Sequence, residues 1–152
     1  MEEIVKQPVD VRQVILAEDD DEDFMVFDLA LKEVDLKVIL TRAQDGEILI
    51  KLLDKNVPDI LFLDLHMPCK DGQHCLREIR ANKKYDALPI IIYSSLRDLL
   101  SIDYCYREGA NFYSVKPGSF QDLKAMLTKI LTIDWKKFLY YPGRSEFVLT
   151  LQ

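Results

Sequence analysis

Four groups of residues that could carry chemistry each come directly after a short apolar run. They are the acidic run 18–23, the single Asp64, the hydroxyl pair Ser94 and Ser95, and Lys116 before Pro117. Clustered carboxylates repel one another and stay ionised together only when a cation joins them. Mg²⁺ meets that need, because it is a hard ion that prefers oxygen ligands and keeps several waters. Beside such an ion Asp64 could act as a nucleophile toward a phosphoryl group, whose charge Mg²⁺ and Lys116 would neutralise together.

These groups can meet only if the apolar runs before them are neighbouring strands of one sheet. The runs are nearly continuous in Val, Ile, Leu and aromatic residues, which is typical of parallel strands buried on both faces. They lie at residues 14–17, 38–41, 60–63, 90–93 and 112–115. Helical spacing of apolar residues alternates with the runs. It is clearest at Phe24, Phe27, Leu31 and Val34 and at Phe120, Leu123, Leu127 and Ile130, and three further helices are expected near 45–55, 71–82 and 98–108.

Five strands that alternate with five helices predict an α/β domain with a doubly wound, five-stranded parallel sheet. Right-handed crossovers leave few strand orders, and 2-1-3-4-5 is the common one. The ligand site of such a sheet lies beyond the carboxyl ends of strands one and three, where the acidic run and Asp64 are expected. We divide the chain into an N-terminal extension 1–12, one domain 13–131, and a C-terminal tail 132–152.

Composition limits the classes of function. The net charge of -6 argues against nucleic acid as a direct partner, since such binding rests on Lys and Arg. No apolar run reaches the roughly 18 residues that cross a bilayer, and the first residues are not those of a secretory signal. Cys69, Cys75 and Cys105 form no CxxC pair, which indicates reduced thiols. These features predict a cytoplasmic protein without a membrane partner.

Four segments resemble the receiver domain of two-component response regulators, over roughly residues 13–131. Each is weak alone, but four in the right order at suitable spacing are highly specific. The segments are ILAEDD at 15–20, PDILFLDLHMPCKDG at 58–72, PIIIYSS at 89–95 and GANFYSVKP at 109–117. The resemblance implies a flavodoxin-like receiver fold. The AEDD opening and the Ile-Asp-Trp at 133–135 look closest to the stand-alone receivers common in Bacteroidetes.

The resemblance also implies the chemistry of the site. Asp64 would accept a phosphoryl group from a phosphohistidine on a sensor histidine kinase or a histidine phosphotransfer protein. Glu18 and Asp19 would hold Mg²⁺, directly or through water, together with Asp64 and the backbone carbonyl of His66. Lys116 would pair with the phosphate. The chain would then be a signalling phosphoacceptor that catalyses only its own phosphotransfer and dephosphorylation.

A switch is implied as well. Ser94 matches the family's switch hydroxyl, which moves to the phosphoryl oxygen, and Tyr113 matches the aromatic residue whose rotamer follows that move. Lys116 and Pro117 would be joined by a cis peptide bond. The output would be a changed affinity for a downstream protein on the face of helix 98–108, strand 112–115 and the last helix. No DNA-binding output domain is expected to follow, and a homodimer is left open.

Some residues have less specific interpretations. The acidic run could be only a solvated helix start, since acidic residues favour a helix N-terminus. With the other groups in register we favour metal binding through Glu18 and Asp19, although Asp20 could replace either. Asp21 and Asp23 are expected only to cap and charge the helix.

Two further expectations concern the rate of hydrolysis and the tail. His66 and Leu96 lie two residues after Asp64 and Ser94, positions that tune phosphate lifetime in the family. The aromatic tail is expected to fold back on its own domain, because an exposed apolar patch of this size is unusual. The alternative is a docking or dimerisation segment in which residues 147–151 add an edge strand to a partner.

Three other functions are disfavoured. A phosphatase or mutase of the haloacid-dehalogenase type would carry Asp-x-Asp, but His66 stands at the second position. A flavodoxin-like nucleotide site would offer backbone N–H groups to a phosphate, which the acidic run would repel instead. A pseudo-receiver would lack part of the site, whereas the acidic pair, Asp64 and Lys116 are all present.

Overall fold

One parallel sheet of five strands forms the centre of the protein. The computed structural model describes residues 11–135 and 141–149, so residues 1–10 of the predicted extension and several tail residues lie outside the described part. The strands are β1 (Arg12–Ala17), β2 (Val38–Ala43), β3 (Ile60–Leu63), β4 (Ile90–Ser94) and β5 (Phe112–Val115). Their order is β2-β1-β3-β4-β5 and every pair is parallel, which confirms the predicted topology.

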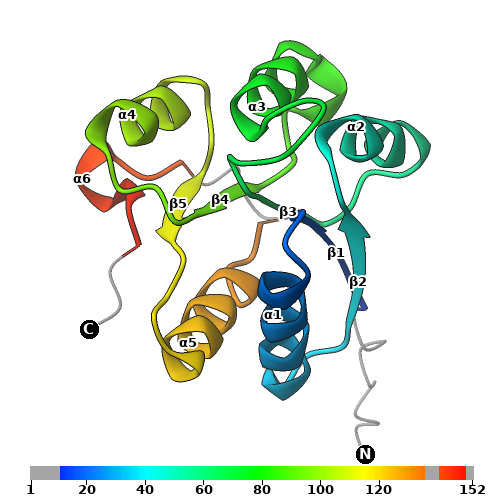
Figure 1. Ribbon diagram of the computed structural model, residues 1–152, viewed down its shortest axis with the longest axis vertical. Helices are drawn as coiled ribbons and strands as arrows, with labels where there is room; N and C mark the ends of the chain where they lie inside the picture. The colour runs from blue at the N-terminus through cyan, green and yellow to red at the C-terminus, as the bar shows by residue number, and fades with distance from the viewer. Residues whose placement is uncertain (1–10, 136–140, 150–152) are drawn as a thin grey trace, which may run out of the picture.

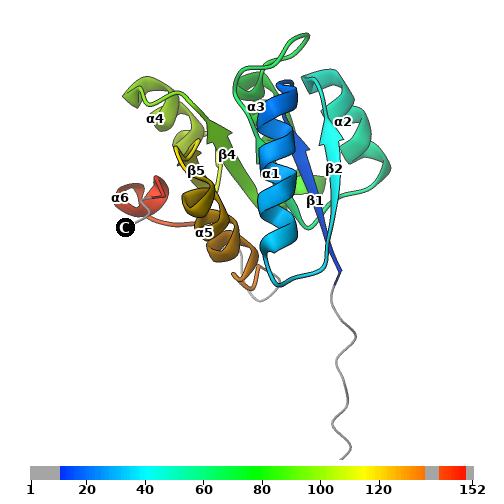
Figure 2. The ribbon, with the colours of Figure 1, turned by 60° about the horizontal axis from the view of Figure 1, so that its bottom comes forward.

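Helices cover both faces of the sheet. They are α1 (Asp21–Glu33), α2 (Gly46–Lys55), α3 (Gly72–Ala81), the 3₁₀ turn η1 (Lys83–Tyr85), α4 (Leu99–Arg107), α5 (Phe120–Leu131) and the short α6 (Arg144–Phe147). Figure 1 shows α1 and α5 on one face and α2, α3 and α4 on the other, and Figure 2 gives a second view of the same layers. No helix in the described part of the chain is long and apolar enough to cross a membrane.

The two faces of the sheet bury two separate apolar cores. Along β3, Ile60 and Phe62 point toward α1 and α5, whereas Leu61 and Leu63 point toward α2, α3 and α4. Successive side chains of a strand point to opposite faces, so a strand covered on both sides must be apolar at every position. All four residues of β3 are fully buried, which explains the continuous apolar runs in the sequence.

Side-chain caps set the start of each long helix. Asp20, Asp45, Asp71, Asp98 and Ser119 each accept a hydrogen bond from the backbone N–H three residues later. Such a bond satisfies one of the backbone donors left free at a helix N-terminus. The cap at Asp20 makes α1 begin two residues after Asp19, so the loop after β1 is short and the acidic residues stay at the sheet edge.

The described tail residues pack along the free edge of β5. Phe147 in α6 is fully buried, and its ring meets those of Tyr106 and Tyr113 at centroid distances of 5.2 and 6.3 Å. Val148 forms a parallel bridge with Tyr113, and the Leu149 N–H donates to the Tyr113 carbonyl at 2.9 Å. The backbone pairing expected with a partner is therefore made within the chain at these positions, while Leu151 lies outside the described residues.

Polar contacts add to this packing. The Arg144 guanidinium pairs with the Asp103 carboxylate of α4 at 2.7 Å, and Figure 1 shows α6 beside α4. Trp135 packs edge-on against Phe112, and its indole N–H donates to the Ile130 carbonyl at 3.1 Å. The tail thus joins β5 to the helices on both sides of it.

Candidate functional site

Three carboxylates converge where β1 and β3 end. Glu18 and Asp19 follow β1, and Asp64 follows β3, which lies beside β1 in the sheet. One oxygen from each of the three groups lies within 4.8 Å of the others. Glu18 and Asp64 are buried, whereas Asp19 is exposed, so the cluster opens toward solvent on the Asp19 side.

A divalent cation fits this cluster. The Glu18 side chain is fully buried, and its Oε2 has no hydrogen-bond partner among the described residues. Burial, and next the hydrogen bond and charge of Asp64, raise the pKa of Glu18 from 4.5 to about 9, although Lys116 opposes the shift. A buried oxygen without a partner beside two more carboxylates is a site where a hard cation would remove both the repulsion and the orphaned acceptor.

Lys116 bridges the carboxylates that follow β1 and β3. Its Nζ donates to Glu18 Oε1 at 2.6 Å, to Asp23 Oδ2 at 2.7 Å and to Asp64 Oδ2 at 3.0 Å. Burial lowers the pKa of Lys116, but hydrogen bonds to Asp23 and Glu18 and the charge of Asp64 outweigh it and hold the pKa above its ordinary value. The expectation that Asp23 only charges the helix was therefore wrong, because α1 directs its first turn at Lys116.

A second residue that sequence reasoning missed is Arg42 at the end of β2. Its guanidinium donates to the Glu18 and Asp19 carbonyls, both at 3.0 Å, and to the Asp21 carboxylate at 2.8 Å. These bonds hold the loop after β1 in place from the neighbouring strand. Nothing in the spacing of Arg42 marks it, since the contact exists only after β1 and β2 pair.

The sequence left open whether Asp20 replaces Glu18 or Asp19 as a metal ligand, and these residues have different positions in the fold. Asp20 caps α1 through the Asp23 N–H at 2.9 Å and lies outside the carboxylate cluster. The His66 N–H donates to Asp64 Oδ1 at 3.2 Å, which places the His66 backbone beside the cluster. A ligand role for the His66 carbonyl stays a prediction. A pocket of about 420 Å³ lies next to the cluster and is lined in part by Asp19, Leu65 and His66.

Ser94 and Tyr113 are linked through the loop after β4. The fully buried Ser94 hydroxyl accepts from the Leu96 N–H at 3.2 Å, and the Tyr113 hydroxyl donates to the Leu96 carbonyl at 2.7 Å. Burial raises the pKa of Tyr113 to about 12, so the phenol keeps its proton and acts as a donor. A displacement of Ser94 would therefore shift the backbone of Leu96 and, with it, the hydrogen bond of the Tyr113 hydroxyl.

The predicted cis peptide between Lys116 and Pro117 was wrong. The described residues contain no cis peptide bond. The trans form is the intrinsically preferred isomer even before proline. The Lys116 N–H donates to the Ser94 carbonyl at 2.8 Å, so β4 and β5 remain paired up to the site.

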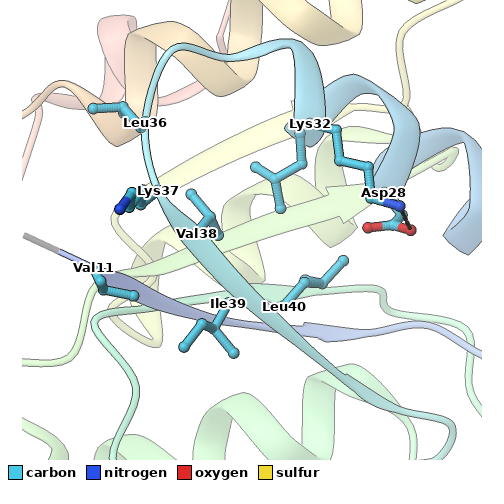
Figure 3. A pocket seen from close by; sticks show the side chains of 9 residues that line it. Val11, Asp28, Lys32, Leu36, Lys37, Val38, Ile39 and Leu40 are labelled. Carbon is cyan, nitrogen blue, oxygen red and sulfur yellow. Dashed lines mark ion pairs between the residues drawn. The ribbon is translucent and has the colours of Figure 1, made fainter.

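A second hollow shares no lining residue with the pocket at Asp19 and His66. It measures about 640 Å³ and is formed by the end of α1 and the exposed edge of β2, as Figure 3 shows. Its charged lining residues include Asp28 and Lys32, whose side chains pair with each other at 3.2 Å, and apolar side chains such as Ile39 make up much of the rest. Asp28 is the one carboxylate among these lining residues, so the hollow lacks the carboxylate cluster found at Asp64.

The fold and the site together define a class. A 2-1-3-4-5 parallel sheet with carboxylates after β1 and β3 and a lysine after β5 is the arrangement of a receiver domain. The family model described as response regulator receiver domain matches residues 14–128, and the chain belongs to this family. Receiver domains are the phosphoacceptors of two-component signalling, as the sequence resemblance predicted.

The chain is also similar in sequence to known regulatory proteins. The chain is 33% identical over 118 residues to the transcriptional regulatory protein AfsQ1 of Streptomyces coelicolor, covering 78% of this chain and 50% of that protein. It is 34% identical over 114 residues to the transcriptional regulatory protein PdtaR of Mycobacterium tuberculosis, covering 74% and 53%. The chain thus spans about half the length of these relatives.

A solved structure shows the same fold. Response regulator RPA3017 in red light signaling of R. palustris is 25% identical, with a TM-score of 0.72 and coverage of 87% of this chain and 96% of that one. The finer likeness to Bacteroidetes stand-alone receivers stays a prediction.

Proposed function

We propose that this protein is the phosphoacceptor of a two-component phosphorelay and that Asp64 receives the phosphoryl group. The donor would be a phosphohistidine on a sensor histidine kinase or a histidine phosphotransfer protein. The observation that carries this proposal is the position of Asp64, which is buried between the Lys116 ammonium and the Glu18 and Asp19 carboxylates. A nucleophilic carboxylate, an ammonium and a cation site then stand within reach of one phosphoryl group.

The transfer step follows from these groups. A carboxylate oxygen of Asp64 forms a bond to phosphorus as the P–N bond of the phosphohistidine breaks. The imidazole nitrogen keeps the bonding electron pair and takes up a proton from water. Lys116 neutralises charge on the phosphoryl oxygens. Glu18, Asp19, Asp64 and the His66 carbonyl would hold Mg²⁺, which supplies further charge neutralisation when bound.

The signal would leave by a change in protein–protein contacts. Ser94 would move toward the phosphoryl oxygen and release the Leu96 N–H, and Tyr113 would follow because its hydroxyl bonds the Leu96 carbonyl. A downstream protein would then read the face of α4, β5 and α5, with the tail packed at its edge as part of that surface. We place the protein in the cytoplasm, without nucleic acid or membrane as partner, and leave a homodimer open.

The test is phosphorylation by acetyl phosphate, followed by intact mass. The wild-type protein is expected to gain one phosphoryl group in the presence of Mg²⁺ and none after chelation. Asp64→Asn should gain none, because the amide is a poor nucleophile. Asp54→Asn, at an exposed position of α2, is the matched control and should behave as wild type.

If acetyl phosphate gives no adduct, the question stays open, since some receivers accept a phosphoryl group only from their own kinase. Beryllofluoride with Mg²⁺ would then be followed by NMR. If neither reagent perturbs the residues around Asp64, the protein is a pseudo-receiver and the proposal is wrong.

Binding of Mg²⁺ is expected to release a proton and to tighten as pH rises. Without the ion the folded Glu18 carboxyl keeps its proton up to about pH 9, because its pKa is raised from 4.5. The unfolded chain releases that proton earlier, so the ion-free fold loses stability as pH rises between these values. Mg²⁺ must displace the proton, and its affinity should rise by up to about tenfold per pH unit between pH 7 and 9.

Calorimetry in two buffers of different ionisation enthalpy measures this proton release. Glu18→Gln should bind Mg²⁺ more weakly and release no proton. Equal binding enthalpies in the two buffers for the wild type would contradict the assignment of Glu18 as the protonated ligand.

A further inference from the structure

All three N–H donors of the Lys116 ammonium are already used in hydrogen bonds. A lysine side chain carries three N–H donors. Lys116 points them at three carboxylates, Glu18 at 2.6 Å, Asp23 at 2.7 Å and Asp64 at 3.0 Å. A phosphoryl group on Asp64 must therefore take a donor away from one of these carboxylates before Lys116 can bind it.

Asp23 differs from the other two partners. Glu18 and Asp64 belong to the three-carboxylate cluster that fits a cation, whereas Asp23 lies outside it, in the first turn of α1. Its side chain is 43% exposed, while that of Glu18 is fully buried. An ion in the cluster would compensate the charges of Glu18 and Asp64. Asp23 would then be the one partner of Lys116 whose negative charge the ion does not compensate.

The same geometry places Asp23 close to an incoming anion. Two acceptors that share one ammonium at hydrogen-bond length lie roughly 4 to 5 Å from each other. A phosphoryl oxygen held by Lys116 would thus be a near neighbour of the Asp23 carboxylate. Like charges at this separation repel, even in a partly solvated site.

We propose that Asp23 is a positioning residue that draws Lys116 away from the phosphoryl group and thereby weakens the adduct on Asp64. The inference rests on the proposed function, since it concerns the same site. Asp23 would act through Lys116 and through its own charge. Its removal should free one ammonium donor and remove one repulsion, so both effects favour the adduct.

The opposite role would be that of an anchor. If Asp23 mainly held Lys116 in place for the phosphoryl group, its removal would let the side chain swing away and would weaken the adduct. The two roles predict changes of opposite sign, so one measurement separates them.

The experiment is a titration of beryllofluoride in the presence of saturating Mg²⁺, followed by NMR. Asp23→Asn keeps the side-chain shape and should bind about tenfold more tightly than wild type. Asp23→Glu restores the charge and should return the affinity to within about threefold of wild type. The matched control is Glu22→Gln, which removes a charge from the same helical turn at an exposed position. It should change the affinity by less than about twofold.

Mg²⁺ affinity without beryllofluoride is the second readout. Loss of a nearby negative charge should leave Mg²⁺ binding unchanged or weaken it, while beryllofluoride binding tightens. A general loosening of the fold would weaken both. Thermal unfolding of each variant checks that the fold is kept.

The outcomes separate the inference from the function on which it rests. If wild type binds beryllofluoride and Asp23→Asn binds no more tightly than Glu22→Gln, the role of Asp23 is overturned and the phosphoacceptor function stands. If Asp23→Glu behaves like Asp23→Asn, charge is not the cause and the inference is again overturned. If neither the wild type nor Asp23→Asn binds beryllofluoride, both the function and the inference fail.

Discussion

Replacing Gly72 with Ala is expected to lower the free energy of unfolding by about 3 kcal/mol and to displace Asp64. A Cβ at residue 72 would lie 2.1 Å from the Asp64 carbonyl oxygen and 2.7 Å from Leu65 Cα. Both are backbone atoms, so no side-chain rotation relieves the contact. The start of α3 and the loop that carries Asp64 would have to separate, which would also break the bond from the Gly72 N–H to the Leu65 carbonyl at 3.0 Å.

Thermal unfolding and phosphorylation by acetyl phosphate measure the two consequences. A loss of this size in a 152-residue chain corresponds to a melting temperature lower by about 6 to 12 °C. The phosphorylation rate should fall as well, since Asp64 no longer meets Lys116 at the right distance. Gly118→Ala is the control, because an added Cβ there meets nothing within 4 Å. A Gly72→Ala protein with wild-type stability and rate would show that the loop is not held by this close approach.

Replacing Phe147 with Ala should destabilise the protein by about 3 to 4 kcal/mol. The ring is fully buried between Tyr106 of α4 and Tyr113 of β5. It belongs to the apolar core on the face of the sheet that α2, α3 and α4 cover. Its removal leaves a cavity at the edge of β5, which the short α6 cannot close without breaking the bond from Leu149 to Tyr113. We expect the tail to detach and Tyr113 to gain solvent exposure.

Urea unfolding and hydrogen exchange at β5 check this prediction. Leu100→Ala is the matched control on α4, since Leu100 is 83% exposed and should change stability by less than about 0.5 kcal/mol. A small effect of Phe147→Ala, comparable to that of Leu100→Ala, would contradict the packing of the tail against β5. Because the Tyr113 hydroxyl also bonds the loop after Ser94, a change in beryllofluoride affinity in Phe147→Ala would show that the tail and the site are coupled.

The arrangement of the sheet followed from local patterns. The inner strands β3 and β4 are buried at every position, so their sequences are almost continuously apolar. The edge strand β2 instead alternates partly buried and exposed positions over most of its length. The order of the strands followed from handedness and short connections, which leave few alternatives. Helix starts were expected at Asp45, Asp71 and Asp98, each of which proved to be the cap before the helix. A cap is half inside the helix, and sequence patterns place such boundaries only approximately.

The convergence of Glu18, Asp19 and Asp64 also followed from the sequence. Parallel strands end at the same edge of a sheet, so residues after β1 and β3 must meet once the strand order is known. Asp23 and Arg42 could not be placed in this way. Their contacts depend on the direction of α1 and on the pairing of β2 with β1, and Asp23 meets Lys116 across 93 positions of the chain.

The sequence by itself determined the family, the strand order and the edge of the sheet where the carboxylates gather, because these depend on periodicity and on which residue follows each strand. Only the tertiary structure decided how Lys116 divides its three donors, which oxygen of Glu18 stays without a partner, and where Phe147 packs. These features depend on distances between side chains from separate elements. Such distances are set by the packing of helices on the sheet, and no local pattern encodes them.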